Sequence, residues 1–325
     1  MYEKWLVGVD LGGTTIKIAF ISHNGEIIHK WQVPTNKSEK GRYIPIEIAK
    51  SIDQTLAELG EPKNRLMGIG IGAPGPVNLV NGSVDIAVNL GWENFHLKDI
   101  LEMESFLPVV VDNDANVAAI GEMWKGAGNG AKDLICVTIG TGVGGGIISN
   151  GKVVHGINGA AGEIGHLTSV TECGTLCNCG KTGCLETVAS ATGIVRLTIE
   201  ELISTHTPSK LRDLYLDQET ISAKLVFDAA NEGDELAKRV INRVTFYLGL
   251  SLANLANALN PEKLVIGGGV SKAGDALLVP LKQQFSRFAF PRVNKGVDIT
   301  IATLGNDAGV IGSAWLIKEM LRNQI

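Results

Sequence analysis

The chain has 325 residues, of which 45% are hydrophobic, and a formal net charge of -5 at pH 7. This length favours about two domains, and the hydrophobic content excludes the disordered and fibrous classes. The acidic balance excludes a general attraction to nucleic acid or to an anionic membrane surface. No apolar run reaches the roughly 18 residues of a membrane span, and the N-terminal residues contain no signal peptide, so we expect a cytoplasmic protein.

Glycine is the unusual feature of the composition. The chain contains 40 glycines, whereas an average usage of about 7% would give roughly 23. Residues 121–193 contain 18 of them, but residues 194–266 contain only Gly233 and Gly249. Glycine concentrated in part of a globular chain indicates backbone that turns sharply or closely approaches another group.

The pattern predicts alternating strands and helices, which is typical of an α/β protein. The chain opens with a strand, a glycine turn and a second strand over residues 5–21, and a hairpin signal at Asn24-Gly25 precedes a third strand near 26–33. Further strands are expected at 66–72, 108–112, 134–139, 147–149, 152–155, 263–266 and 297–303. Helices are expected at 44–59, 114–124, 185–203, 219–230, 234–258, 273–287 and 308–322.

The opening pattern recurs in the middle of the chain. Asn24-Gly-Glu-Ile-Ile-His29 is similar to Asn150-Gly-Lys-Val-Val-His155, and each follows a strand, a glycine turn and another strand. Unrelated hairpins also show chance similarity, but two similar meanders favour two similar domains. No Pro- or Ser-rich linker separates them, so we expect a hinge near residues 116–130.

Three glycine loops are candidates for nucleotide binding. In Asp10-Leu-Gly-Gly-Thr-Thr15, the backbone N–H groups at Gly12 and Gly13 can approach phosphate oxygens, and Thr14 and Thr15 add hydroxyl donors. Asp10 is suited to hold Mg²⁺, directly or through water. An ordinary hairpin turn is the alternative.

The other two loops follow later strands. One runs from Gly140 through Thr141, Gly142 and Gly144 to Gly146, and the other contains Gly267 and Gly268 and could lie against a base or ribose. Neither the Asp10 loop nor the Gly140 loop matches a Walker A loop or leads directly into a helix as a dinucleotide fingerprint requires. The third loop precedes a predicted helix, and a simple strand-to-helix turn is its alternative. Together the three loops indicate a nucleoside triphosphate between two domains.

A polar turn follows the apolar strand at 108–112. Its sequence is Asp112-Asn-Asp-Ala-Asn116, directly before a predicted helix. Asn113 or Asp114 could cap that helix, while a neighbouring carboxylate accepts a proton from a substrate hydroxyl during phosphoryl transfer.

A histidine and several cysteines lie close together in the sequence. His166, Cys177, Cys179 and Cys184 form a His-Cys₃ set that suits a closed, structural Zn²⁺ site. Free or disulfide-linked cysteines are the alternative; Cys173 is a rival ligand, and Cys136 is expected in the core. Such a metal would hold Glu163, His166 and Glu186 in one place, where they could bind the hydroxyls of a polyhydroxylated ligand.

These motifs resemble the ROK family of bacterial sugar kinases and repressors, within the actin-like ATPase superfamily, and among its members the ATP-dependent glucokinases. The resemblance rests on Asp10-Leu-Gly-Gly-Thr-Thr15, Gly72-Ala-Pro-Gly-Pro-Val77, Asn89-Leu-Gly-Trp92, Asn113-Asp-Ala-Asn116, the Gly140 loop, Gly162-Glu-Ile-Gly-His166, Cys177-x-Cys-Gly-x-x-Gly-Cys184 and Ile266-Gly-Gly-Gly269. It covers nearly the whole chain, and the extra Cys173 departs from it.

The resemblance implies two actin-like ATPase (ribonuclease H-like) α/β domains, with an active site in the cleft between them and a zinc-binding loop. It implies that Asp114 is the general base on a hexose 6-hydroxyl, and that His166 contacts both sugar and zinc. Substrate would bind Gly72, Asn89, Asn113, Glu163, His166 and Glu186. Nucleotide would bind Asp10, Gly12, Gly13, Thr14, Thr15, Lys17, Gly140, Thr141, Gly142, Gly144, Gly267 and Gly268.

The sequence therefore predicts an ATP-dependent hexose 6-kinase, with glucose as the expected substrate and ATP, Mg²⁺ and structural Zn²⁺ as cofactors. Fructose, mannose and the N-acetylated hexosamines remain alternatives, and a sugar-sensing repressor is the rival from another class. We expect a small domain at 1–117, onto which a helix at 308–325 packs, a large domain at 118–307, and a homodimer.

Overall fold

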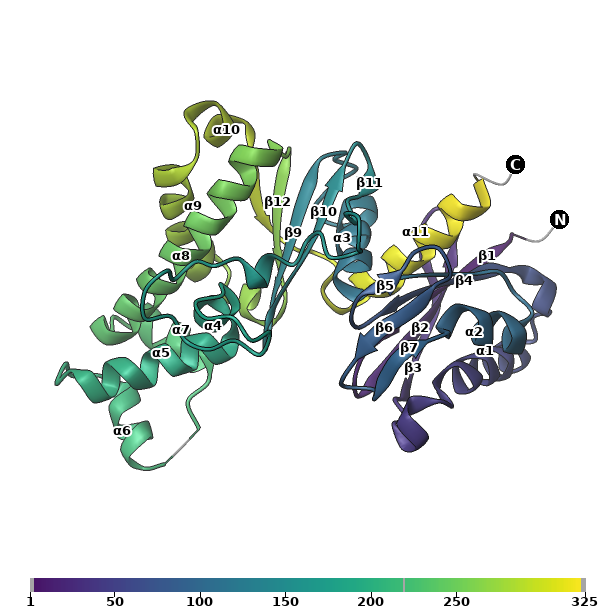
Figure 1. Ribbon diagram of the computed structural model, residues 1–325, viewed down its shortest axis with the longest axis horizontal. Coiled ribbons are helices and arrows are strands. Elements are labelled where there is room, and N and C mark those ends of the chain that lie inside the picture. Colours follow the sequence, from purple (N-terminus) through teal and green to yellow (C-terminus); the bar gives the residue numbers. More distant parts are fainter. Residues whose placement is uncertain (1–2, 219, 323–325) are drawn as a thin grey trace.

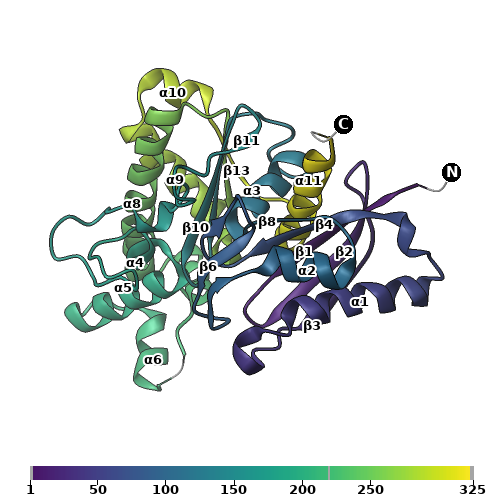
Figure 2. The same ribbon diagram turned by 45° about the vertical axis from the view of Figure 1, so that its right-hand side comes forward.

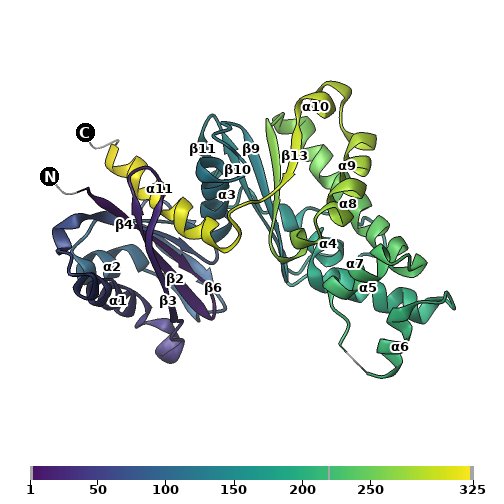
Figure 3. The same cartoon turned by 180° about the vertical axis from the view of Figure 1, so that it is seen from behind.

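The computed structural model of the protein describes residues 3–218 and 220–322. It has two lobes, each built around one five-stranded sheet (Figure 1). Helices α3 (Asp114–Lys125) and α11 (Ala308–Arg322) lie between the two sheets, as seen from both sides in Figures 1 and 3. Both helices therefore belong to the region that joins the lobes.

The first sheet has the strand order β3-β2-β1-β4-β8. Its apolar face forms a core with α1 (Ile44–Leu59) and α2 (Leu97–Ser105), which lie side by side on it (Figure 2). A small sheet of β5, β6 and β7 extends this lobe. The strands are β1 (Trp5–Leu11), β2 (Thr15–Ser22), β3 (Ile27–Pro34), β4 (Leu66–Ala73), β5 (Val77–Asn78), β6 (Ser83–Ala87), β7 (Trp92–Phe95) and β8 (Val109–Asn113).

The second sheet has the order β11-β10-β9-β12-β13, and helices of the same lobe pack on it to form the largest core cluster. Its strands are β9 (Leu134–Ile139), β10 (Val143–Ser149), β11 (Lys152–Val153), β12 (Lys263–Gly267) and β13 (Asp298–Ile301). Its helices are α4 (Glu186–Ala189), α5 (Ala191–Ser204), α6 (Lys210–Leu216), α7 (Ala223–Asn231), α8 (Glu235–Leu259), α9 (Asp275–Phe288) and α10 (Pro291–Gly296).

The two sheets repeat one arrangement. In each, the first strand pairs antiparallel with the second and parallel with the fourth, and the fourth pairs parallel with the fifth. The internal repeat predicted from the two similar hairpins is therefore confirmed at the level of the strands.

The expected elements agree with the structure except in a few places. The single helix expected at 185–203 is wrong, because Ser190 has an extended backbone there and caps α5 by accepting from the Gly193 N–H at 3.0 Å. The small sheet and the short helices α2, α6 and α10 were not expected. Residues 1–2, 219 and 323–325, which several expected ranges include, lie outside the described residues.

No helix in residues 3–218 and 220–322 is long and apolar enough to cross a membrane.

Glycines allow the backbone of α11 to contact the backbone of α3 on one side and of the first sheet on the other. A Cβ on Gly312 would lie 1.7 Å from the carbonyl oxygen of Val117, and one on Gly121 would lie 2.1 Å from that of Ala308. On the side of the first sheet, a Cβ on Gly8 or Gly70 would lie 2.0 or 1.7 Å from a carbonyl oxygen of α11. These distances exclude any side chain, so these four glycines serve the close packing of α11 against α3 and the first sheet.

A buried carboxylate fixes both chain segments that connect the lobes. The Glu122 side chain, on α3 and 1% exposed, accepts from the Ala127 N–H at 2.8 Å in the segment leading to β9. It also accepts from Thr303 N–H at 3.1 Å and Leu304 N–H at 2.9 Å, in the segment from β13 to α11. The three donors satisfy a charge that would otherwise be costly to bury.

We predict that Gly312→Ala destabilises the protein although alanine is the better helix former. The added methyl group would push α11 away from α3, and overpacking against backbone should cost at least about 2 kcal/mol, more than the roughly 1 kcal/mol gained in helix propensity. Thermal unfolding should show a midpoint lower by several degrees. Gly296→Ala in α10 is the matched control, because its Cβ would meet no atom within 4 Å, and an equal effect of both changes would contradict the prediction.

Candidate active site

Three neighbouring strands of the first sheet bring polar groups to one edge. Asp10 on β1 is in register with Gly72 on β4, and Gly72 is in register with Asp112 on β8. Since these strands are parallel, their carboxyl ends, and the turns that follow, lie at the same edge, where ligands of α/β sheets commonly bind. Gly72 has a packing role there, because its Cβ would lie 2.3 Å from Val117 of α3.

The first glycine turn joins β1 to β2 as a tight hairpin. The Gly12 N–H donates to the Thr15 carbonyl at 3.1 Å, and the Thr35 hydroxyl donates to the Gly12 carbonyl at 2.7 Å. The Lys17 ammonium lies 3.0 Å from Asp10 Oδ2. Asn89 lies beside the turn, since a Cβ on Gly13 would be 3.6 Å from that of Asn89. The turn and Asn89 are thus brought together.

Asn113 and Asp114 have different roles at the start of α3. Asn113 is the N-cap: its side-chain oxygen accepts from Ala115 N–H at 2.9 Å and Asn116 N–H at 3.3 Å, while its amide donates to the Gly75 carbonyl at 3.1 Å. Asp114 Oδ1 accepts from the same Ala115 N–H at 2.8 Å, while residue Asp114 is exposed and its other carboxylate oxygen is available for a ligand.

The environment of Asp114 makes it a stronger base than an ordinary aspartate. Although water reaches the side chain, the surrounding protein reduces its hydration, and this burial raises its pKa from 3.8 to about 6. The Ala115 N–H and Asn113 side chain oppose the increase, whereas the charges of Asp10 and Glu163 add to it. Asp10 and Glu163, which come from two other segments, thus lie within electrostatic reach of Asp114.

The other two glycine loops lie at one edge of the second sheet. Gly140, Thr141 and Gly142 follow β9, and Gly268 follows β12, which runs parallel to β9. Gly268 has φ of +83°, and its Cβ would lie 2.4 Å from the Ile139 carbonyl, so glycine is needed there for the backbone itself. A Cβ on Gly140 would meet no atom within 4 Å, which leaves that part of the backbone open to a ligand.

Four predicted ligand side chains form a group suited to a metal ion. One donor atom from each of His166, Cys177, Cys179 and Cys184 lies within 4.8 Å of the others. The Sγ atoms of Cys179 and Cys184 are 3.6 Å apart, and Cys177 Sγ is 3.6 Å from His166 Nδ1. Tetrahedral Zn²⁺ with bonds of about 2.3 Å to sulfur needs sulfur atoms about 3.8 Å apart, so the donors fit zinc.

The remaining cysteines differ from this group. Cys173 is exposed and is not a member of the four. Cys136 is buried on β9 in an apolar cluster, and burial raises the pKa of its thiol to about 12. The expectation that Cys136 belongs to the core is confirmed.

The metal group contacts the residues expected to bind hydroxyls. His166 uses Nδ1 toward the cysteines, and its Nε2 lies 3.8 Å from a carboxylate oxygen of Glu163. Glu186, the first residue of α4, contacts a different member of the metal group, because Cys177 Sγ is 3.6 Å from its Oε1. The Oε2 of Glu186 accepts from the Val143 N–H at 3.1 Å, directly after the second glycine loop.

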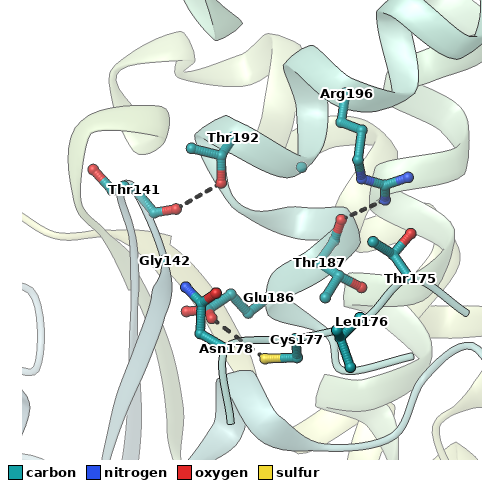
Figure 4. A pocket seen from close by; sticks show the side chains of 11 residues that line it. Thr141, Gly142, Thr175, Leu176, Cys177, Asn178, Glu186, Thr187, Thr192 and Arg196 are labelled. Atoms are coloured by element: carbon teal, nitrogen blue, oxygen red, sulfur yellow. Dashed lines mark hydrogen bonds between the residues drawn. The ribbon is translucent and has the colours of Figure 1, made fainter. Parts of the chain in front are cut away.

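A cavity of about 430 Å³ adjoins this group and the second glycine loop (Figure 4). Thr141 and Gly142 line it, together with Cys177, Glu186 and Arg196. The Thr192 hydroxyl, in the first turn of α5, donates to the Thr141 carbonyl at 2.9 Å, and Arg196 donates to the Thr187 carbonyl at 2.7 Å. Glu186 thus lies where a metal group, a glycine loop and a polar cavity meet.

Sequence reasoning did not identify the partnership of Asp112 and His155. Their side chains are 2.8 Å apart and join the turn before α3 to the segment that follows β11. Thr192 and Arg196 were also missed. The only signals were the acidic turn and the repeated hairpin that ends in histidine, and neither indicates a partner distant in sequence.

Known proteins are similar to this chain over nearly its whole length. The model of the ROK family matches residues 6–320. The chain belongs to the ROK family. A glucokinase of Halalkalibacterium halodurans is 57% identical over 98% of this chain and 96% of its own length.

Two further relatives represent the two functional classes of the ROK family. The crystal structure of a ROK family glucokinase from Streptomyces griseus, in complex with glucose and AMPPNP, is 34% identical, covers 97% of this chain and 99% of its own, and has a TM-score of 0.76. A xylose repressor of Caldicellulosiruptor bescii is 32% identical over 97% of this chain and 79% of its own length. The expected fold class, the α/β architecture of ROK sugar kinases within the actin-like ATPase superfamily, is confirmed.

Proposed function

We propose that this ROK family protein is an ATP-dependent glucokinase, which transfers the γ-phosphoryl group of ATP to the 6-hydroxyl of glucose. The observation that carries the proposal is a carboxylate of raised basicity, Asp114, within electrostatic reach of Glu163 and Asp10. The likeness to curated glucokinases, at 57% and 37% identity over nearly the whole chain, supports the same activity.

Asp114 is the general base. As the glucose O6 attacks the γ-phosphorus, the O6 proton passes to the Asp114 carboxylate, the new P–O6 bond forms, and the bond from the γ-phosphorus to the bridging oxygen breaks to release ADP. Glu163, His166 and Glu186 hold the other hydroxyls, and Asn89 and the backbone at Gly72 and Asn113 border the same region.

ATP lies against the three glycine loops. Gly12, Gly13, Thr14 and Thr15 contact phosphate oxygens, with Lys17 and Asp10 beside them; Gly140, Thr141, Gly142 and Gly144 contact them from the second sheet; and Gly267 and Gly268 lie near adenosine. Asp10 would hold Mg²⁺, which would supply charge neutralisation during transfer and offset the repulsion between ATP and the carboxylates of Asp10 and Asp114.

Zn²⁺ bound by His166, Cys177, Cys179 and Cys184 has a structural role. With four protein ligands it leaves no coordination position for substrate. The ion would hold the His166 ring with its Nε2 toward Glu163, and it would hold Cys177 next to Glu186.

We also propose a division of the chain into two domains. We assign the small domain to residues 1–117 and the large domain to 118–307, with the C-terminal helix 308–325 packing back on the small one; within the described residues, α11 contacts β1 and β4 of the first sheet. A homodimer and a cytoplasmic location also stay predictions.

A coupled ADP-release assay with a panel of sugars tests the function. We predict turnover with glucose well above that with fructose, mannose, N-acetylglucosamine or N-acetylmannosamine, and at least about 10²-fold lower kcat for Asp114→Asn with glucose affinity kept. The variant's melting temperature should be unchanged or higher at pH 8, because the folded protein disfavours the ionised carboxylate. Higher turnover with another hexose would contradict glucose as the substrate and assign that hexose instead. Sugar binding without turnover would contradict a kinase and support a sugar sensor.

The raised pKa of Asp114 predicts how activity depends on pH. The base acts only when ionised, so kcat/KM for glucose should be constant above its pKa of about 6 and fall about tenfold per unit below it. A carboxyl of ordinary pKa would keep full activity down to about pH 5. The profile is measured with excess coupling enzyme, and tryptophan fluorescence checks that the protein stays folded. A constant kcat/KM from pH 7 to 5 would exclude Asp114 as the titrating base.

Metal analysis tests the zinc site. Protein purified without chelator should contain about one Zn²⁺ per chain, and Cys179→Ser should lose most of it because one of four ligands is removed. Its KM for glucose should rise, since His166 and Glu186 lose their support. Cys173→Ser is the matched control and should retain both metal and KM; loss of zinc in that variant would place Cys173 among the ligands.

A further inference from the structure

A hydrogen bond between Asp112 and His155 connects the two lobes beside the site. Asp112, near the end of β8, is 3% exposed, and His155 follows β11 of the second sheet. His155 Nε2 lies 2.8 Å from Asp112 Oδ2. An ionised carboxylate can only accept, so Nε2 carries the proton and donates it.

Asp112 uses its other oxygen to fix the turn that carries the proposed base. Asp112 Oδ1 accepts from the Asn113 N–H at 2.7 Å and from Asn116 Nδ2 at 2.9 Å. The two donor residues, Asn113 and Asn116, precede and follow Asp114 in the sequence. A carboxylate buried to this degree needs such donors, and their positions set the direction in which the chain leaves β8.

His155 stands at the start of the segment that ends at Glu163 and His166. The His155 carbonyl accepts from the Ala161 N–H at 3.0 Å, which closes the loop between them. Within this loop, a Cβ on Gly159 would lie 3.2 Å from the Val77 carbonyl of β5, so the loop also lies against the first lobe. One imidazole therefore connects the base's turn to the segment of the proposed hydroxyl-binding residues.

We propose that His155 is a positioning residue, which acts through Asp112 to set the distance between Asp114 and the 6-hydroxyl of a sugar whose other hydroxyls Glu163 and His166 hold. This inference rests on the proposed kinase function. Without the imidazole, sugar still binds its hydroxyl partners, but the base is displaced from the 6-hydroxyl. A misplacement of about 1 Å can cost about 10²-fold in rate, so the effect should fall on kcat and spare KM.

The internal repeat supplies a matched control. His29 occupies the position in the first hairpin that His155 occupies in the second. His29 lies on β3, with its ring centroid 5.7 Å from that of Trp31. His29→Ala therefore removes a similar histidine from a similar hairpin without touching the turn before α3.

The experiment compares His155→Ala, His155→Gln and His29→Ala. We expect His155→Ala to lower kcat for glucose by about 30- to 100-fold with KM changed less than about threefold. Glutamine, whose amide can donate to Asp112, should restore kcat to within about fivefold of the original protein, and His29→Ala should stay within about twofold. A kcat for His155→Ala within twofold of the original, or equal losses for alanine and glutamine, would overturn the proposal.

Hydrogen exchange gives a readout that does not depend on the reaction. Amides of residues 112–118 should exchange about five- to tenfold faster in His155→Ala, and glutamine should restore their protection; unchanged exchange there would overturn the proposal even if the protein phosphorylated no sugar. If His155→Ala does not fold, His155→Phe, which keeps the ring volume without the N–H, takes its place in both measurements. Absence of turnover in the original protein would contradict the proposed function alone.

Discussion

The backbone contact between α3 and α11 is the constraint on which the site depends. At Gly121 and Gly312 the two helices are too close for any side chain, and at Gly8 and Gly70 the first sheet meets α11 equally closely. Because α3 begins at Asp114, this packing determines where the proposed base stands. Glu122, the residue that follows Gly121, accepts hydrogen bonds from both connecting segments and so holds the same helix to the second lobe.

The carboxylates of Asp10 and Glu163 lie near that of Asp114, and the chemistry of the site depends on how their negative charge is compensated. Burial, with the nearby charges of Asp10 and Glu163, raises the pKa of Asp114 and makes it a stronger base. The nearby Lys17 offsets part of the charge at Asp10. In the proposed reaction ATP would add further negative charge, which a divalent cation would offset, and the neutral hydroxyls of a sugar would suit the second substrate.

Glu186 shows how one residue serves two parts of the site. Its carboxylate reaches Cys177 in the metal group and the Val143 N–H after the glycine loop, and it lines the cavity between them. The cysteine spacing predicted the metal group, because ligands a few residues apart fold around one ion. It could not predict the link to Val143, which is distant in sequence and depends on how the second sheet meets α4.

Hydrophobic periodicity and glycine motifs predicted the strands of the two five-stranded sheets, most helices and the internal repeat, because these depend on local spacing. The break at Ser190 escaped prediction, since a capping serine competes there with helical periodicity. The sequence alone thus determined the repeated α/β pattern, the glycine loops, the acidic turn and the His-Cys₃ group. Only the tertiary structure decided that Gly312 and Gly121 serve helix packing, that Asn113 is the cap of α3, and that His155 contacts Asp112. Each of these depends on distances between segments far apart in the chain, and the order of residues does not contain those distances.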